Sequence, residues 1–368
     1  MSLQIEAYRA EHSPAVHAFN ERLARGGIEF RFPEQAVSRD FPPHDGAALK
    51  QEFYLAVDGE YVRGGYILKS ESFFGPRGES LLGNYQLPLS EGIVDRTQAM
   101  VGVKLLWDAI ARQPSLYCLG MGGLERPLPK MLARLGWSVE AVPFFFRVVR
   151  ASRFLAEIRF LRQGPGRAPL LDLARFSGLG ALGRGGWDAW TAVRRPALSS
   201  LVKMRRVRSF GPDVDALVLD LGKSREAFCD RRASALALKF PESDARFVRI
   251  VVEEDGQLKG WALLTRSTLQ DHKQFGNLRL GCVADNFARP GYEAHVLRFA
   301  YATLLEEGVD LVVTNQSHQR WTEALKGEGF LRGPSNFALA RSPRFTELSG
   351  PLDHVHFTRG DGDGPIHL

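Results

Sequence analysis

The chain of 368 residues contains few cysteines and no long apolar run. Its three cysteines, Cys118, Cys229 and Cys282, lie far apart and form no CxxC pair, so the sequence predicts neither a disulfide framework nor a zinc site. It contains no run of about 18 apolar residues, the length of a membrane-spanning helix, and its amino terminus has no basic-then-apolar signal pattern. A cytoplasmic location is therefore the expectation.

The remaining composition is that of an ordinary globular protein, with 44% hydrophobic and 24% charged residues and enough length for two buried cores. The net charge of +6 is uneven, because only Glu157, Asp172 and Asp188 oppose the many arginines between Arg147 and Arg208. We interpret residues 151–212 as a basic, partly helical insert. It is either a linker that packs its apolar faces on the neighbouring domains, or a set of amphipathic helices in weak contact with an anionic membrane surface. In the second case the protein would be peripheral to the membrane.

Two halves of the chain follow the same order of predicted elements. Each contains a predicted hairpin with an Asp-Gly turn, at Asp58-Gly59 and at Asp255-Gly256, followed by a basic residue and glycine. Residues 83–149 and 275–340 then both predict a strand, a glycine-containing turn, a helix, a strand, a short helix and a closing strand. This agreement indicates a tandem duplication.

We therefore predict four parts of the chain. They are an N-terminal domain at 1–150, the insert at 151–212, a C-terminal domain at 213–350 and a tail at 351–368. Within the C-terminal domain, residues 213–246 are expected to open the second copy with a strand and a helix.

In the second copy, polar residues follow the β-branched strand predicted at 311–314, which is the edge of an α/β sheet where ligands bind. Asn315, Ser317 and Trp321 are predicted to bind substrate, and His318, with an ordinary pKa near 6.5, could accept an ammonium proton. An alternative is that Asn315 and Ser317 cap the next helix, which would leave His318 and Trp321 unexplained.

The order of elements, with Gly291 opening one helix and Gly329-Phe330 closing the next, resembles the acyl-CoA-binding half of the GNAT (GCN5-related N-acetyltransferase) superfamily. The resemblance covers most of 1–150 and 213–345. It implies an α/β (α+β) fold class, with two tandem GNAT-like folds and the basic helical insert between them.

The resemblance also implies acetyl-CoA or another acyl-CoA as co-substrate and no metal. Backbone N–H groups at a helix start would hold the pyrophosphate. Glu293, beside the expected pyrophosphate of the second copy, would repel it, which favours the first copy. The residues predicted to bind the donor at this turn are Met100, Val101, Gly102 and Val103 in the first copy and Gly291 in the second.

GNAT enzymes often use a tyrosine on the last short helix as an acid, but the aligned positions here are Leu132 and Leu325, which cannot donate a proton. Catalysis would then depend on other groups. The predicted catalytic residues are Glu91 and Asp95 at the end of the fourth strand of the first copy, Asp285 at the comparable end of the second copy, and His318.

The leading hypothesis is an N-acyltransferase, in the first instance an acetyltransferase, that moves an acyl group to a primary amine of a small molecule, amino sugar or peptide. One alternative follows from a looser resemblance of residues 233–243 to FemAB-like proteins: an aminoacyl-tRNA-dependent transferase whose basic middle contacts tRNA. The other is a non-catalytic scaffold with two degenerate GNAT folds. No feature of the sequence predicts an oligomeric state.

Overall fold

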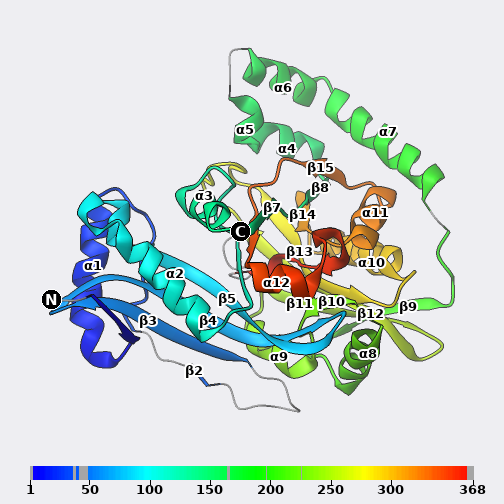
Figure 1. Ribbon diagram of the computed structural model, residues 1–368. Coiled ribbons are helices and arrows are strands. Elements are labelled where there is room, and N and C mark those ends of the chain that lie inside the picture. Colours follow the sequence, from blue (N-terminus) through cyan, green and yellow to red (C-terminus); the bar gives the residue numbers. More distant parts are fainter. Residues whose placement is uncertain are drawn as a thin grey trace. The chain divides into compact units, whose positions relative to one another are not determined.

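The computed structural model describes residues 3–35, 39–40, 49–163, 166–195, 197–224 and 226–362 (Figure 1). The chain forms two compact units, the first made of Met1–Glu140 and Ala338–Gly350 and the second of Ala141–Phe337 and Pro351–Leu368. In the described part of the chain, no helix is long and apolar enough to cross a membrane.

The first unit is built on a mixed sheet with the strand order β1-β3-β4-β5-β6-β16-β7, and β2 pairs with β3 at its edge. Its elements are β1 (Gln4–Ala7), η1 (Ala10–His12), α1 (Ser13–Arg25), β2 (Arg39–Asp40), β3 (Lys50–Asp58), β4 (Tyr61–Gly75), β5 (Gly78–Ser90), η2 (Glu91–Ile93), η3 (Arg96–Gln98), α2 (Met100–Arg112), β6 (Leu116–Leu119), α3 (Pro127–Arg134), β7 (Ser138–Ala141), β16 (Ala338–Arg341) and α12 (Pro343–Ser349).

The second unit is built on a sheet with the strand order β15-β8-β14-β13-β12-β11-β9. Its elements are β8 (Phe144–Val148), α4 (Ala151–Glu157), α5 (Arg159–Arg162), α6 (Arg167–Phe176), α7 (Leu179–Arg194), β9 (Val202–Val207), α8 (Pro212–Lys223), β10 (Ala227–Cys229), α9 (Ala233–Lys239), β11 (Phe247–Glu254), β12 (Gln257–Thr268), β13 (Arg279–Ala288), α10 (Glu293–Glu306), β14 (Leu311–Asn315), α11 (Gln319–Gly327), β15 (Leu331–Gly333), η4 (Leu352–His354), β17 (Val355–His356) and η5 (Arg359–Asp361).

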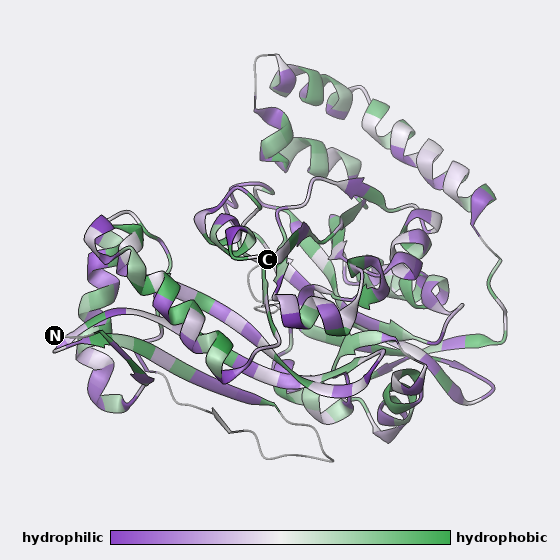
Figure 2. Ribbon diagram, in the orientation of Figure 1, coloured by the Kyte–Doolittle hydropathy of each residue, from purple (hydrophilic) through white to green (hydrophobic). Residues whose placement is uncertain are grey.

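Helix α2 forms because its apolar residues fall on one face. Val101, Leu105, Leu106 and Ala109 recur at helical spacing and are buried against the sheet. Hydrophobic and hydrophilic residues accordingly alternate along α2 in Figure 2. Helix α10 repeats the arrangement in the second unit, with Val296, Leu297, Ala300 and Leu304 in the core.

The two units exchange strands. β8 follows β7 directly in sequence, yet it pairs antiparallel with β14 and β15 of the second sheet. β16 follows the second copy, yet it pairs antiparallel with β6 of the first sheet. Burial explains the exchange, because Phe145 of β8 belongs to the second core and Ala340 of β16 belongs to the first. The units therefore differ in extent from the predicted ranges 1–150 and 213–350.

The predicted repeat is confirmed in both copies by the hairpins β3-β4 and β11-β12 and by the helices and strands after them. The Asp-Gly turn of the second hairpin takes left-handed backbone conformations at Asp255 (φ 52°) and Gly256 (φ 72°), as a tight hairpin turn requires. The three cysteines are buried and free.

The structure differs from the predicted opening of the second copy, a strand and a helix at 213–246. The sheet of the second unit already includes β9, inside the segment interpreted as a helical insert, and 213–246 contains α8, β10 and α9. β9 pairs antiparallel with β11 at the sheet edge, with Val202 and Met204 against the core and Arg205 exposed and ion-paired with Glu253 at 2.8 Å. The insert is helical from α4 to α7.

Candidate functional site

In each unit, two parallel strands diverge toward their carboxyl ends. β5 pairs with β6 at Gly83 and Asn84 and continues to Ser90, and β13 pairs with β14 over Leu280–Cys282 and continues to Ala288. A β-bulge interrupts the pairing of each diverging strand with its other neighbour. In β5 it contains Leu87 at a left-handed φ of 44°, and in β13 the register shifts opposite Leu263 and Leu264. Divergence at the carboxyl ends of parallel strands opens a gap where a ligand can enter.

The tail segment, residues 355–361, fills this gap in the second unit. On one side, the N–H of Ser317 donates to the carbonyl of Phe357 at 3.1 Å, and the N–H of Phe357 donates to Ser317 Oγ at 2.7 Å. On the other side, the hydroxyl of Thr358 donates to Asp285 Oδ1 at 2.9 Å. The tail segment thus bonds both to the continuation of β14 and to β13.

A buried ion network fixes the tail segment. Arg231 is fully buried and binds Asp285 Oδ1 at 3.1 Å and Asp361 Oδ2 at 2.7 Å. Burial raises the pKa of Asp285, and the charge of Arg231 opposes that rise. Asp285, predicted as a base, therefore lies inside the protein and bonds to the tail.

Ser317 and Trp321 contact the same segment, whereas Asn315, the last residue of β14, contacts the chain just before β8. Asn315 Nδ2 donates to the carbonyl of Val142 at 3.2 Å, and Ser317 Oγ donates to the carbonyl of Val355. The buried ring of Trp321 stacks on His356 with centroids 5.4 Å apart. Asn315, Ser317 and Trp321 thus contact other groups of the protein, and these contacts stabilise the chain at the carboxyl end of β14.

His318 is the N-cap of α11, because its Nδ1 accepts the N–H of Arg320 at 3.2 Å. The expectation that Asn315 and Ser317 cap this helix is wrong. Burial, together with the charge of Arg320, lowers the pKa of His318 to about 4. The imidazole is therefore neutral at pH 7 and a weak base.

The start of α10 bonds to its own first turn. Gly291 has a left-handed φ of 91°, and its N–H donates to Glu293 Oε2 at 2.8 Å. The other oxygen of Glu293 pairs with Arg320 Nε at 2.8 Å. The amide predicted to hold a phosphate in the second copy is thus engaged by a carboxylate.

The second unit retains a small pocket near this edge, with a volume of about 150 Å³. Its lining includes Ser317, Gln319 and two cationic side chains, Lys326 and Arg332.

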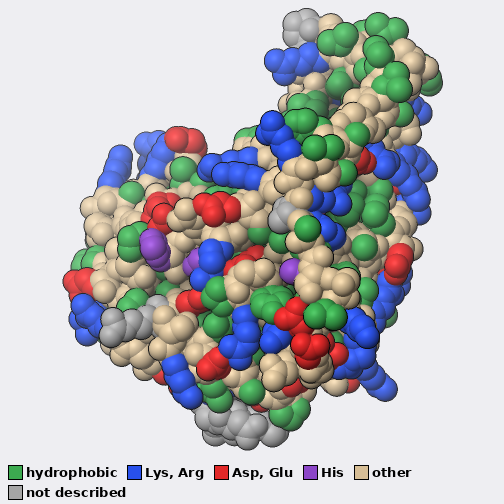
Figure 3. Space-filling view, turned by 90° about the vertical axis from the view of Figure 1, so that its right-hand side faces the viewer, with side chains coloured by type: hydrophobic (Ala, Val, Ile, Leu, Met, Phe, Trp, Pro, Cys, Tyr) green, Lys and Arg blue, Asp and Glu red, His purple; other side chains and the backbone are tan. Residues whose placement is uncertain are grey.

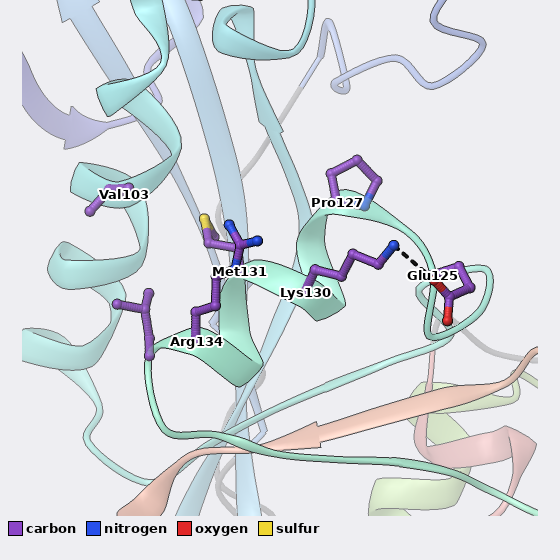
Figure 4. A pocket seen from close by; sticks show the side chains of 7 residues that line it. Val103, Glu125, Pro127, Lys130, Met131 and Arg134 are labelled. Carbon is purple, nitrogen blue, oxygen red and sulfur yellow. Dashed lines mark ion pairs between the residues drawn. The ribbon is translucent and has the colours of Figure 1, made fainter.

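The first unit carries a larger pocket, about 570 Å³, between α2 and α3. This volume is within the range of sites for small molecules and cofactors. Figure 4 shows α2 at one side and the side chains of α3 at the other. The lining residues are Val103, Glu125, Pro127, Lys130, Met131, Arg134 and Leu135.

Two cations and two apolar side chains of this pocket come from one stretch of chain. Lys130 and Arg134 are four residues apart on α3 and therefore share a helix face. Met131 and Leu135 supply apolar wall. Lys130 pairs with the exposed carboxylate of Glu125 at 2.8 Å. A phosphate could displace such an exposed partner at little energetic cost.

The predicted residues at the start of α2 divide by burial. Met100 is 62% exposed, Val101 is buried in the core and Val103 lines the pocket. Gly102 faces Ser90, since a Cβ added at Gly102 would lie 3.6 Å from Ser90 Cβ. The helix start thus borders the pocket and leads back to the end of β5.

The two predicted carboxylates of the first unit have different surroundings. Glu91 is buried, with Oε1 bound by Arg22 at 2.6 Å and Oε2 by Arg63 at 2.9 Å, so it joins α1 and β4. Asp95 is partly exposed and caps η3, accepting the N–H of Thr97 at 2.9 Å. Hydrogen bonds from the side chain and the backbone of Thr97 lower the pKa of Asp95.

Lys130, Met131 and Arg134 are not among the residues predicted from the sequence, although the helix that carries them is. Both aligned leucines, Leu132 and Leu325, are fully buried, which fixes the register between α3 and α11. In that register Lys130 corresponds to Glu323 and Arg134 to Gly327. The sequence feature that could have indicated this pocket is a pair of cations at helical spacing in the first copy, which has no equivalent in the second.

No family model and no curated protein matches the chain. Among solved structures, it is similar to Saccharomyces cerevisiae N-myristoyltransferase with bound myristoyl-CoA, with a TM-score of 0.51 and 11% identity over 97% of this chain and 84% of that one. It is also similar to a GCN5-related N-acetyltransferase from Anabaena variabilis, with a TM-score of 0.52 and 8% identity over 93% and 73% of the two chains. A probable N-acyltransferase from Enterococcus faecalis has a TM-score of 0.52 and 7% identity over 94% and 74%.

At these identities the likeness shows the fold. The chain folds as two tandem GNAT-like domains; the first two of these solved structures are N-acyltransferases and the third is a probable one. The looser similarity to FemAB-like proteins stays a prediction.

Proposed function

We propose that the chain is an acyl-CoA-dependent N-acyltransferase and that its first unit binds the donor. The observation that carries this proposal is the difference between the two units. The first has a pocket of about 570 Å³ between α2 and α3, whereas in the second the tail segment occupies the gap between the diverging strands β13 and β14. The fold, shared with N-acyltransferases, supports the reaction class.

The charges of the first unit suit the phosphates of CoA. Lys130 and Arg134 would bind phosphate oxygens, and the start of α2 would add the favourable end of the helix dipole. Met131 and Leu135 would contact apolar parts of the donor. In the second unit Glu293 already accepts the amide of Gly291, which disfavours an anion there.

In the proposed reaction the amine nitrogen attacks the thioester carbonyl carbon. The new C–N bond forms, the C–S bond breaks, and the amine loses a proton as the thiolate leaves. We assign Asp95 as the base because it is ionised at neutral pH and partly exposed, whereas both oxygens of Glu91 are bound by arginines. Leu132 supplies no acid, so water or the released ammonium proton would protonate the thiolate.

The donor would be acetyl-CoA or a longer acyl-CoA, and the acceptor a primary amine of a small molecule, amino sugar or peptide. Calorimetric titration with acetyl-CoA and with myristoyl-CoA tests the donor, and release of free thiol after addition of amines tests transfer. Binding in the micromolar range with amine-dependent thiol release supports the proposal. Failure to bind either thioester would overturn it.

A non-catalytic scaffold is the second candidate. It is favoured by the buried leucines at both tyrosine positions and by the filled gap of the second unit. If the chain binds a thioester but releases no free thiol when any class of primary amine is added, the scaffold would be favoured over an acyltransferase.

A further inference from the structure

Helices α6 and α7 of the insert carry large apolar side chains on the surface of the second unit. We call the following residues the apolar stripe; those on α7 recur at positions that share one helix face. They are Leu170, Leu173 and Phe176 on α6 and Leu179, Leu182, Trp190 and Val193 on α7. Phe176 is 76% exposed and Val193 is 87% exposed. Large apolar side chains exposed in this number on two neighbouring helices mark an interaction site.

The opposite face of α7 is fixed to the second unit, so the stripe has a defined orientation. Asp188 pairs with Arg147 of β8 at 2.9 Å, and Trp187 Nε1 donates to the carbonyl of Gly329 at 2.9 Å. Thr191, on the same face, is buried. On α6, Asp172 accepts two hydrogen bonds from Arg162, at 2.9 and 2.8 Å.

Arginines lie beside the aromatic members of the stripe. The Arg175 guanidinium lies 4.8 Å from the ring centroid of Phe176, and the Arg194 guanidinium lies 4.3 Å from that of Trp190. Figure 3 shows hydrophobic side chains gathered on the helices at the top of the view, with Lys and Arg side chains next to them. Arginine beside exposed aromatic and aliphatic residues is typical of a surface that enters the headgroup region of a bilayer.

The acidic side chains of the insert do not neutralise this surface. Asp172 and Asp188 bind arginines, and Glu157 accepts the N–H of Asn277 at 2.9 Å. The exposed arginines therefore leave the surface positive. They are Arg153, Arg167, Arg175 and Arg194.

From this combination we propose that the apolar stripe docks on an anionic lipid surface. Its leucine, phenylalanine and tryptophan side chains would enter the boundary between headgroups and acyl chains, and the arginines would bind phosphate and carboxylate groups of the lipids. The charge complementarity selects lipid over an apolar protein groove, which would leave the arginines without partners. The proposal stands independently of the acyl-transfer reaction.

Vesicle flotation with the full chain tests the proposal. We expect binding to vesicles of equal parts phosphatidylcholine and phosphatidylglycerol, little binding to phosphatidylcholine alone, and weakening by salt. The double change Phe176→Glu and Leu182→Glu should reduce binding roughly tenfold or more, and Arg175→Gln with Arg194→Gln should reduce it by a similar factor. Because all four side chains are exposed, the thermal melt should be unchanged.

Leu219→Glu is the matched control, since Leu219 is an exposed leucine on α8 of the same unit. It should leave vesicle binding unchanged. Three results would overturn the proposal: no binding to the anionic vesicles, equal binding by the stripe variants, or a dimer in light scattering that the stripe variants dissociate. The last would make the stripe an interface between two copies of the chain.

Discussion

Glu91 and Asp95 show that the partners of a carboxylate decide its role. Glu91 directly follows β5 and Asp95 lies four residues later, in the region where the sequence predicts a base. The partners of Glu91 come from α1 and β4, 69 and 28 residues away in sequence, so no local pattern indicates that both its oxygens are engaged. The partner of Asp95 is two residues away, and an Asp-x-Thr pattern indicates such a cap.

Asp95→Asn separates capping from catalysis. Asparagine keeps an oxygen that accepts the N–H of Thr97, so the free energy of unfolding should change by less than about 1 kcal/mol. Loss of the base should lower kcat by about 100-fold and flatten the acidic limb of the pH profile. Steady-state thiol release between acidic and neutral pH measures both effects. Unchanged turnover would remove Asp95 from the mechanism.

His318 should make the second unit sensitive to acid. Its folded pKa of about 4 lies below the unfolded value, so the unfolded state takes up a proton first as the pH falls below about 6.5, and stability is lost progressively down to about 4. His318→Asn keeps a cap and removes this titration. Allowing for partial exposure, we expect the variant to lose about 1 to 2 kcal/mol less than the parent between pH 7 and pH 5.

Urea unfolding at the two pH values measures the difference. His17 of the first unit is exposed and has a raised pKa, so its replacement by Asn should not reduce the acid sensitivity. An identical loss in the His318→Asn variant and the parent would show that His318 is not responsible.

At the scale of elements, local patterns predict what local interactions stabilise. The Asp-Gly hairpins and helices α2 and α10 follow from turn residues and apolar spacing. β9 could not be predicted this way, because its basic sequence becomes a strand through pairing with β11. The exchange of β8 and β16 is equally non-local, since nothing within Phe144–Val148 specifies pairing with β14 rather than with the preceding copy.

Phe145→Ala tests the exchange. Phe145 follows the first copy in sequence but is buried in the second core, so the change should cost the second unit about 3 to 5 kcal/mol. Hydrogen exchange should accelerate in β13 and β14 and stay unchanged in β4 and β5. Phe146→Ala, on the less buried face of the same strand, should have a smaller effect. Faster exchange confined to β4 and β5 would contradict the assignment of β8.

Gly360→Val tests the tail segment. A Cβ at Gly360 would lie 3.0 Å from Asp285 Cβ and 3.1 Å from Phe240 Cζ, so valine should destabilise the second unit by about 1 to 3 kcal/mol. Donor affinity should not change, because the donor is assigned to the first unit. Gly327→Ala is the control, with no atom within 4 Å of the added Cβ. Urea unfolding measures the stability of the second unit, and calorimetric titration measures the donor affinity. A tighter donor complex in the Gly360→Val variant would show that the tail segment competes with acyl-CoA.

In the whole molecule one fold occurs twice, with different surroundings at the two candidate sites. The duplication could be predicted from the sequence, and Glu293 already favoured the first copy. The filling of the second gap could not, because the tail segment meets Asp285 from 73 residues away in sequence. The cations of α3 were present in the sequence, but their pocket depends on the spacing between α2 and α3 in the folded unit.

The most direct test of the central claim is the stoichiometry and location of donor binding by calorimetric titration. We expect one acyl-CoA to bind per chain, with affinity reduced about 10-fold to 100-fold by Lys130→Glu and Arg134→Glu together. The matched control, Lys326→Glu with Arg332→Glu in the small pocket of the second unit, should bind normally. Two donors per chain, or loss of binding in the control but not in the α3 variant, would contradict the account.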